Sequence, residues 1–125
     1  MIYFDHAATS FPKPERVYQA VQECMRKYGA NPGRSGHRLS LKAGREIYRV
    51  REKVSELFHI DNPLQVVFTC NATESLNLGL KGILKPGDHV ITTSMEHNSV
   101  LRPLKRLESL GVDCTIVSCN SEGML

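Results

Sequence analysis

Hydrophobic residues recur at three- and four-residue spacing in several parts of the chain, which is the pattern of amphipathic helices. The first such stretch opens at Pro14, a residue suited to the start of a helix, and is stopped by Gly29. A loop rich in turn-forming residues follows over residues 30–39, and Ser40 is placed to cap the second helix. The spacing predicts helices over residues 14–28, 40–58, 73–84 and 100–110.

Short runs rich in β-branched residues alternate with the last two of these helices. They predict strands over residues 65–70, 89–94 and 112–117. From residue 64 onward the order is β-α-β-α-β, which indicates an α/β fold with a parallel sheet and right-handed crossovers. The segment 120–125 stands where a further turn and helix would follow, so this portion of the sheet is expected to be incomplete.

The composition is that of a folded globular chain. Its 125 residues suit one compact domain, and 23% of them are charged. The longest apolar runs are only a few residues, far below the roughly 20 that cross a bilayer. The first residues also lack the basic and apolar regions of a secretory signal. We therefore expect a cytoplasmic protein with no membrane partner.

Charge and cysteine spacing exclude two further kinds of partner. The net charge of +3 comes from 16 basic and 13 acidic residues that are interleaved without a basic block, which argues against nucleic-acid binding. The cysteines form no CxxC pair and no histidine completes a zinc set, so no metal site is expected. They are predicted to be reduced and mostly buried, at Cys24, Cys70, Cys114 and Cys119.

The junction between the predicted strand at 65–70 and the helix after it is the first candidate for chemistry. Small and hydroxyl residues there allow close approach of a ligand to the backbone, and the first amides of a helix attract an anion. Phosphate binding by this turn is one interpretation of residues 68–74. An ordinary helix cap, made by Thr73 or by Asn71 in an Asx turn, is the other, and the turn lacks a glycine signature.

A second candidate, His97, follows the predicted strand at 89–94. Ligands of open α/β sheets bind outside the carboxyl ends of the strands, so both junctions share one edge. An imidazole there can stack on a flat heteroaromatic ring or handle a proton, although it can equally be a surface residue beside a helix cap at Asn98 or Ser99. The other histidines divide by context. His59 and His89 flank apolar segments and suggest structural roles, and both roles stay open for His6 and His37.

Four blocks of sequence, taken together in this order, carry a family resemblance. They are Tyr3-Phe4-Asp5-His6-Ala7-Ala8-Thr9, Asn31-Pro32-Gly33-Arg34-Ser35-Gly36-His37, Phe68-Thr69-Cys70-Asn71-Ala72-Thr73-Glu74-Ser75-Leu76-Asn77 and Glu96-His97-Asn98-Ser99-Val100-Leu101. The chain resembles the N-terminal part of the class V aminotransferases over its whole length, and most closely the cysteine desulfurase branch.

The resemblance implies a pyridoxal 5'-phosphate enzyme of fold type I that works as a homodimer. By the match, Asn71, Ala72 and Thr73 bind the cofactor phosphate, and His97 stacks on the pyridine ring and assists proton transfer as the catalytic residue. The loops carrying His6, Ala7 and Asn31 match those on the substrate side of the pocket. His6 stands where the family more usually has Asn. The implied division is an N-terminal segment over 1–39, with one helix and the substrate-side loop, and the first part of the large cofactor-binding α/β domain over 40–125.

In the family, a lysine forms the Schiff base, an Asp pairs with the pyridinium nitrogen and a mobile cysteine takes the substrate sulfur, so that cysteine becomes alanine and the enzyme a persulfide. All three groups lie downstream of these blocks, and no lysine of this chain stands in the family's Ser/Thr-x-His-Lys setting. The chain is therefore expected to be part of a larger enzyme and inactive alone, with a cysteine substrate and a sulfur-acceptor protein as partners of the parent.

Other interpretations remain open beside the desulfurase. A selenocysteine lyase, a kynureninase-like hydrolase or a transaminase of the same family would share these blocks, and a non-catalytic fragment or remnant would keep them by ancestry. In the family the strand at 65–70 neighbours strands from later in the chain. Its edges would be open here, so the isolated chain is expected to be oligomeric or only partly ordered.

Overall fold

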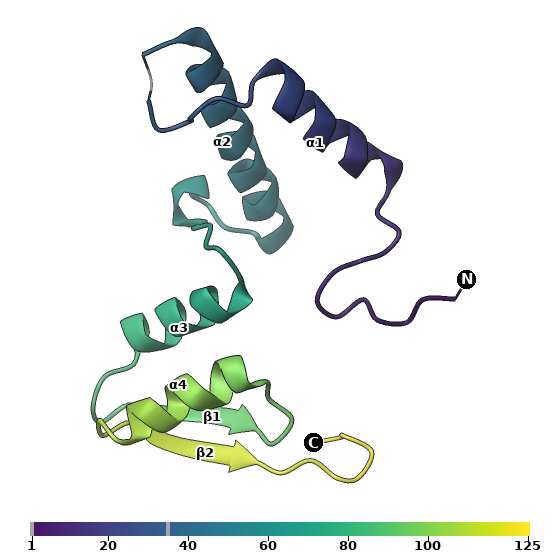
Figure 1. The fold of residues 1–125 in the computed structure, drawn as a ribbon. Coiled ribbons are helices and arrows are strands. Elements are labelled where there is room, and N and C mark those ends of the chain that lie inside the picture. Colours follow the sequence, from purple (N-terminus) through teal and green to yellow (C-terminus); the bar gives the residue numbers. More distant parts are fainter. Residues whose placement is uncertain (1, 35) are drawn as a thin grey trace. The chain divides into compact units, whose positions relative to one another are not determined.

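The computed structural model describes residues 2–34 and 36–125, and Met1 and Ser35, which belong to the first predicted segment, lie outside the described residues. Figure 1 shows helices in the first half of the chain and a mixed α/β arrangement in the second. The elements in chain order are α1 (Glu15–Lys27), α2 (Arg38–Phe58), a 3-10 turn (Pro63–Gln65), α3 (Ala72–Ile83), β1 (His89–Thr93), α4 (Asn98–Glu108) and β2 (Asp113–Val117).

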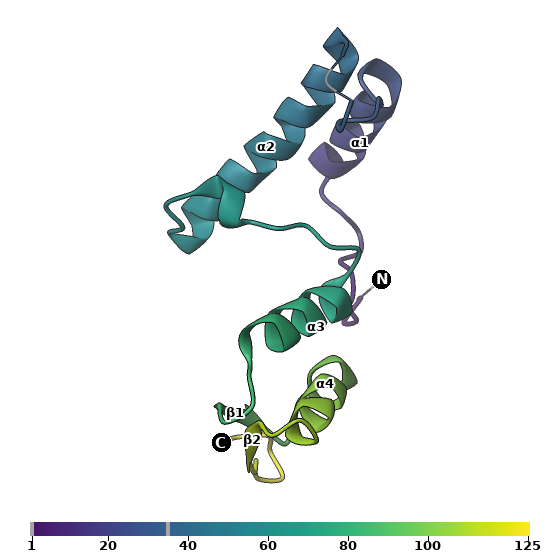
Figure 2. The same ribbon diagram turned by 90° about the vertical axis from the view of Figure 1, so that its left-hand side faces the viewer.

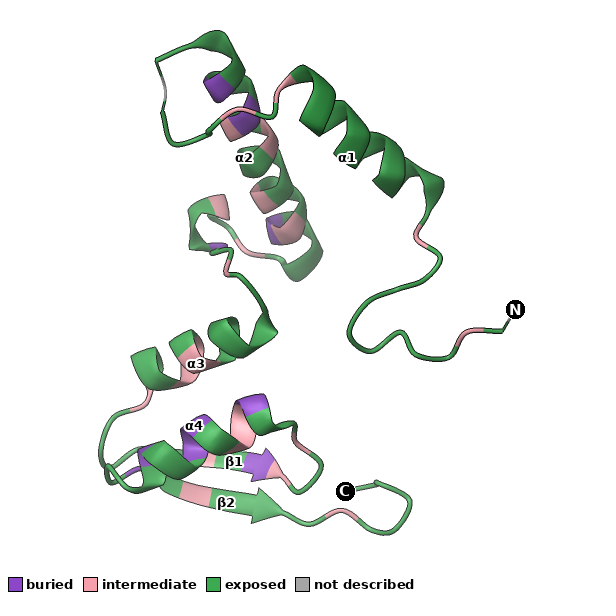
Figure 3. Ribbon diagram, in the orientation of Figure 1, coloured by how far each residue is buried: buried purple, intermediate pink, exposed green. Residues whose placement is uncertain are grey.

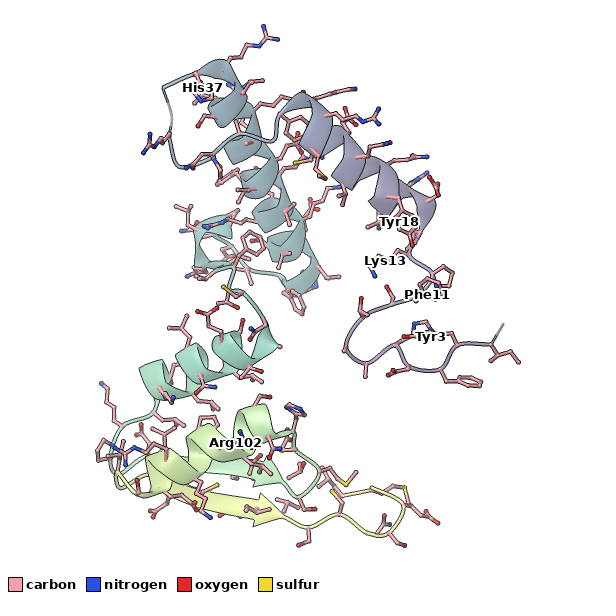
Figure 4. The ribbon with its side chains drawn as sticks, viewed as in Figure 1. Tyr3, Phe11, Lys13, Tyr18, His37 and Arg102 are labelled. Carbon is pink, nitrogen blue, oxygen red and sulfur yellow. The ribbon has the colours of Figure 1, made fainter. Side chains whose placement is uncertain are left out.

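The four predicted helices are confirmed, with small shifts at their ends. Pro14 is the residue before α1 rather than its first residue, and its carbonyl accepts the amide of Val17 at 2.8 Å. Ser40 does not cap α2, so that prediction was wrong. The helix begins two residues earlier because the Nδ1 atom of His37 accepts the Ser40 amide at 3.3 Å. His37, labelled in Figure 4, thus has a structural role.

The predicted strand over residues 65–70 is absent from the structure. Gln65 ends the 3-10 turn and Val66 has an extended backbone, but residues 66–69 belong to no sheet. Residues of this type favour a strand only when a neighbouring strand completes the hydrogen-bond ladder. In the described part of the chain, β1 and β2 pair with each other and with no third strand.

The second half of the chain is a small α/β unit. β1 and β2 run parallel with His89 opposite Asp113 and Thr93 opposite Val117. Figures 1 and 2 both show α4 beside α3 and next to the strand pair. The buried centre of this unit consists of Leu104, Leu107 and Val112. It is small, as the few buried positions of Figure 3 show, because one face of the strand pair remains open and Ile91 on that face is 66% exposed.

The chain forms two compact units, Met1–Val66 and Val67–Leu125. The first contains α1, α2 and the 3-10 turn. The second contains the α/β elements. The division predicted from the sequence, into 1–39 and 40–125, is a different one, because it separates the substrate-side loops from the cofactor-binding domain by function. It stays a prediction.

The N-terminal segment is held by local contacts around Tyr3, Phe11 and Lys13, which Figure 4 labels. The ring of Phe11 meets the ring of Tyr3 edge to face at 5.7 Å. The ammonium group of Lys13 donates to the Thr9 hydroxyl at 3.0 Å and to the carbonyl of Ser10 at 2.9 Å. These bonds shape the loop that leads into α1.

The cysteines are free thiols, but the prediction that most are buried was wrong. Cys24 and Cys70 are exposed, and Cys114 and Cys119 are half-buried. Cys24 is exposed because α1, whose residues are all described, has no buried position. Burial beside the core of the second unit raises the pKa of the Cys114 thiol, and the Glu108 carboxylate raises it further, so this thiol stays protonated at neutral pH.

Truncating Leu107 tests the importance of the small core. Leu107 is 5% exposed, so Leu107→Ala leaves a cavity and is expected to lower the free energy of unfolding by about 2–3 kcal/mol in a urea titration. The matched control is Leu78→Ala on α3, where the side chain is 58% exposed and the expected loss is below about 0.5 kcal/mol. Equal losses from the two variants would show that Leu107 is not part of a packed core.

Candidate active site

The N-terminus of α3 is closed by a reciprocal pair of hydrogen bonds. The Asn71 side chain caps the helix, with Oδ1 accepting the Glu74 amide at 2.9 Å. The Glu74 carboxylate reaches back and accepts the amide of Cys70 at 2.7 Å. The first bond satisfies an amide that the helix itself leaves without an acceptor, and the second ties the residue before the cap to the helix. Of the two capping alternatives the sequence left open, the structure therefore selects Asn71 and not Thr73.

Hydroxyl groups on either side of this cap hold the turn further. The Thr69 hydroxyl donates to the carbonyl of Asn71 at 2.9 Å and is hydrogen-bonded to the hydroxyl of Ser75. The side-chain Nδ2 group of Asn77 donates to the carbonyl of Thr73 at 2.9 Å. Because the cap uses the amide of Glu74, the amides of Ala72 and Thr73 stand at the first two helical positions, where a helix offers no carbonyl acceptor. An anion at this end would meet those two amides and the positive end of the helix dipole.

His97 is itself the residue that caps α4, rather than a neighbour of a cap at Asn98 or Ser99. Its Nδ1 atom accepts the backbone amide of Ser99 at 3.1 Å and is 2.9 Å from the Ser99 hydroxyl. An Nδ1 atom that accepts from an amide carries no proton, so the neutral ring holds its proton on Nε2. The cap thus fixes the orientation and the tautomer of an exposed imidazole.

The N-terminal ends of α3 and α4 open onto one cleft of about 370 Å³. Thr73 and His97, both predicted site residues, line this cleft together. Among residues 2–34 and 36–125, no carboxylate lines it. The remaining lining is polar or basic, apart from one proline, and consists of Asn77, Lys81, Asn98, Ser99, Arg102, Pro103 and Arg106.

The basic residues of this cleft were missed by the sequence analysis. Their signal lies in two stripes at four-residue spacing, one on each helix: Thr73, Asn77 and Lys81 on α3, and Asn98, Arg102 and Arg106 on α4. Arg102 is labelled on α4 in Figure 4. Each stripe alone is the ordinary solvated face of a helix. Only the packing of α3 beside α4 makes them two walls of one cleft.

The predicted substrate-side residues belong to the first unit. The Nε2 atom of His6 is 3.0 Å from the carbonyl of Tyr3, and its ring lies edge to face on the Tyr3 ring at 4.9 Å. Asn31 forms a turn in which Oδ1 accepts the amide of Gly33 at 2.8 Å, and its carbonyl accepts the hydroxyl of the buried Ser40 at 2.6 Å. Ala7 is exposed in the loop after His6. Their role toward a substrate stays a prediction.

The other two histidines lie at the end of α2 and on β1. His59 ends α2 with a left-handed backbone at φ 54°. His89 bonds through Nε2 to the hydroxyl of Thr115 on the neighbouring strand at 2.8 Å. The bond of His89 across the strand pair agrees with a structural role, and the structural role of His59 stays a prediction.

The family model of the class-V aminotransferases matches residues 2–125. The chain belongs to this family. It is 38% identical over 130 residues to the cysteine desulfurase IscS of Vibrio atlanticus (strain LGP32), a match that covers 99% of this chain and 32% of that protein. A probable cysteine desulfurase of Methanothermobacter thermautotrophicus is 34% identical over 125 residues, with 99% of this chain and 31% of that protein covered.

Solved structures of similar proteins agree with this class-V assignment. A NifS-like protein superposes with a TM-score of 0.72 and 31% sequence identity, covering 89% of this chain and 30% of that one. DndA from Streptomyces lividans superposes with a TM-score of 0.69 and 30% identity, covering 93% of this chain and 33% of that one. The chain thus spans about a third of the length of these relatives, and its α/β fold is confirmed as that of their corresponding part.

None of the helices in the described ranges 2–34 and 36–125 is both long enough and apolar enough to span a membrane.

Removing the Asn71 cap tests whether this side chain holds the turn before α3 in shape. Asn71→Ala is expected to lower the free energy of unfolding of the second unit by about 1 kcal/mol and to speed hydrogen exchange of the first amides of α3. Asn98→Ala is the matched control, because Asn98 is the first residue of α4 and His97 supplies the cap there. The capping role is contradicted if the two substitutions change exchange at α3 equally.

Proposed function

We propose that this chain carries the phosphate- and ring-binding part of a pyridoxal 5'-phosphate-dependent cysteine desulfurase. The observation that carries the proposal is that Thr73 and His97 line one cleft, at the adjacent N-termini of α3 and α4, and that its charged lining groups are cationic. This arrangement matches a ligand with an anionic group at one end and a flat ring at the other.

The residues of the cleft fit the cofactor phosphate. Thr73 lines the cleft, and the amides of Ala72 and Thr73 at the first two positions of α3, together with the helix dipole, would receive an anion there. Asn71 acts through the cap, since its side chain is engaged with the Glu74 amide. Its part is to hold the turn in shape rather than to bind the phosphate directly.

His97 fits the ring end of the same ligand. Two contacts from Ser99 to Nδ1 hold the imidazole in one orientation, so one of its flat faces is available for stacking. The bound cofactor would supply an electron sink for the substrate carbanion, and the protein would supply orientation and electrostatics. His97 would carry a proton on Nε2, because Nδ1 accepts the Ser99 amide, and would be the residue that transfers protons in this site.

Cysteine is the substrate that we infer, because the relatives named above are cysteine desulfurases. In that reaction the C–S bond of cysteine breaks, the sulfur passes to an enzyme thiolate as a persulfide and alanine leaves. A homodimer, a sulfur-acceptor protein and a cytoplasmic location complete this proposal. His6, Ala7 and Asn31 would approach the substrate side. A selenocysteine lyase, a kynureninase-like hydrolase or a transaminase would use the same cofactor turn.

The experiment is a turnover assay on two proteins. We expect the reading frame that encodes this chain to continue past Leu125 to a Ser/Thr-x-His-Lys lysine and a loop cysteine, and its product to release alanine and sulfide from cysteine. The 125-residue chain supplied with cofactor should give no turnover above a protein-free cofactor control, because none of its lysines stands in the Schiff-base setting. Transamination without sulfide release by the longer protein would refute the desulfurase assignment, and turnover by the short chain would refute the inactivity.

The phosphate turn can be tested without turnover. When inorganic phosphate is titrated into the chain, the NMR chemical shifts of the Ala72 and Thr73 backbone amides should change. Asn71→Asp keeps a capping oxygen but adds a negative charge at the anion site, so it should weaken phosphate binding roughly fivefold. Thr115→Asp adds the same charge on β2, which lines no part of the cleft, and should leave binding within about twofold. If both substitutions weaken phosphate binding equally, the effect comes from the net charge of the protein and not from a site at the N-terminus of α3.

A further inference from the structure

The cleft at the helix N-termini continues along α3 and α4 into a second hollow. This second hollow has a volume of about 500 Å³ and shares Lys81 and Arg106 with the first. We call the two together the α3–α4 groove. It runs beside α3 from Thr73 to Leu84, a length of about 17 Å at the rise of an α-helix. A single phosphate at the Thr73 end would leave most of this length uncovered.

The middle of the α3–α4 groove is cationic. Lys81, Arg102 and Arg106 are exposed and line it from both helices. Within the described ranges 2–34 and 36–125, no carboxylate lines either hollow. The ion pairs found in those ranges, Lys27 with Glu23 and Arg49 with Glu46, lie in the first unit. Three positive charges without an acidic partner in the lining make this part of the groove complementary to carboxylates.

The far end of the α3–α4 groove is apolar. Its lining beyond the shared cations consists of Leu84, Pro86, Leu107, Leu110 and Val112. Leu110 is 49% exposed there, between the core residues Leu107 and Val112 in the sequence. A cationic stretch that leads into an apolar hollow accommodates a ligand with acidic and apolar groups in the same order.

We propose that the α3–α4 groove binds an acidic polypeptide segment of a partner protein, with carboxylates at Lys81, Arg102 and Arg106 and an apolar side chain in the hollow at Leu110. The stretch of α3 from Asn77 to Leu84 spans about 10 Å, which an extended segment of about three residues matches at a rise of roughly 3.3 Å per residue, so the Thr73 end stays free for an anion. A nucleic acid matches less well, since its sugar-phosphate backbone would leave the apolar end unfilled. The binding needs no cofactor and can hold even if the proposed function fails, but Lys81, Arg102 and Arg106 also line the cleft that the proposed function gives to the cofactor.

The test uses the 125-residue chain and a fluorescein-labelled peptide with glutamates followed by leucines, read by fluorescence anisotropy. The chain should bind this peptide, and the double variant Arg102→Gln/Arg106→Gln should weaken binding roughly fivefold or more. Lys105→Gln is the control for loss of charge, because Lys105 lies on the same helix and lines neither hollow. It should change binding less than about twofold. Replacing the peptide leucines with serines should also weaken binding.

Reversing the charge on both the groove and the peptide separates loss of binding from loss of folding, because a misfolded variant would bind neither peptide. Arg102→Glu/Arg106→Glu should lose the glutamate peptide and gain binding to a peptide with lysines in place of the glutamates. The proposal is overturned if the chain does not bind the glutamate peptide, if Lys105→Gln weakens binding as much as the double variant, or if a glutamine peptide binds equally well. Preference for a single-stranded oligonucleotide over the glutamate peptide would also overturn it.

Discussion

The exchange of hydrogen bonds between Asn71 and Glu74 is the constraint on which the candidate site depends. Asn71 accepts the amide of Glu74, and Glu74 accepts the amide of Cys70, so both side chains are fixed at the N-terminus of α3. This leaves the next amides, of Ala72 and Thr73, at the open end of the helix. A negatively charged carboxylate so close to an anion site would repel a ligand if it were free. Its engagement with Cys70 turns it away from the cleft into the preceding turn, and Glu74 does not line the cleft.

The packing of α4 determines which residues surround the N-terminus of α3. Leu104 and Leu107 bury one face of α4 beside Val112, which leaves the opposite stripe of Arg102 and Arg106 toward α3 and solvent. The same burial places His97, at the beginning of α4, beside Thr73 at the beginning of α3. A small hydrophobic centre thus determines which polar groups meet in the cleft. The four cysteines have no part in that lining.

The four helices and the strands β1 and β2 were predictable from local sequence patterns, and the side-by-side packing of distant segments was not. The helices follow from apolar spacing within one turn or two. The cap of α2 was misassigned because Ser is the usual capping residue, whereas His37 supplies the acceptor here. Segment 65–70 has strand propensity but joins no sheet in the described residues. Arg102 and Lys81 could not be recognised before α3 and α4 were known to adjoin, because no local motif connects residues that lie twenty positions apart.

The segment between the 3-10 turn and α3 has a consequence for the handling of this protein. Val67 is 64% exposed and Phe68 is 48% exposed, in a stretch outside any helix or sheet at the boundary between the two compact units. Proteases bind their substrates in an extended conformation, and exposed stretches without regular structure are where nicking concentrates. Phe68 also offers the aromatic side chain that chymotrypsin-type enzymes accept. During purification, this short stretch is the natural place for the chain to be clipped into its helical and α/β halves.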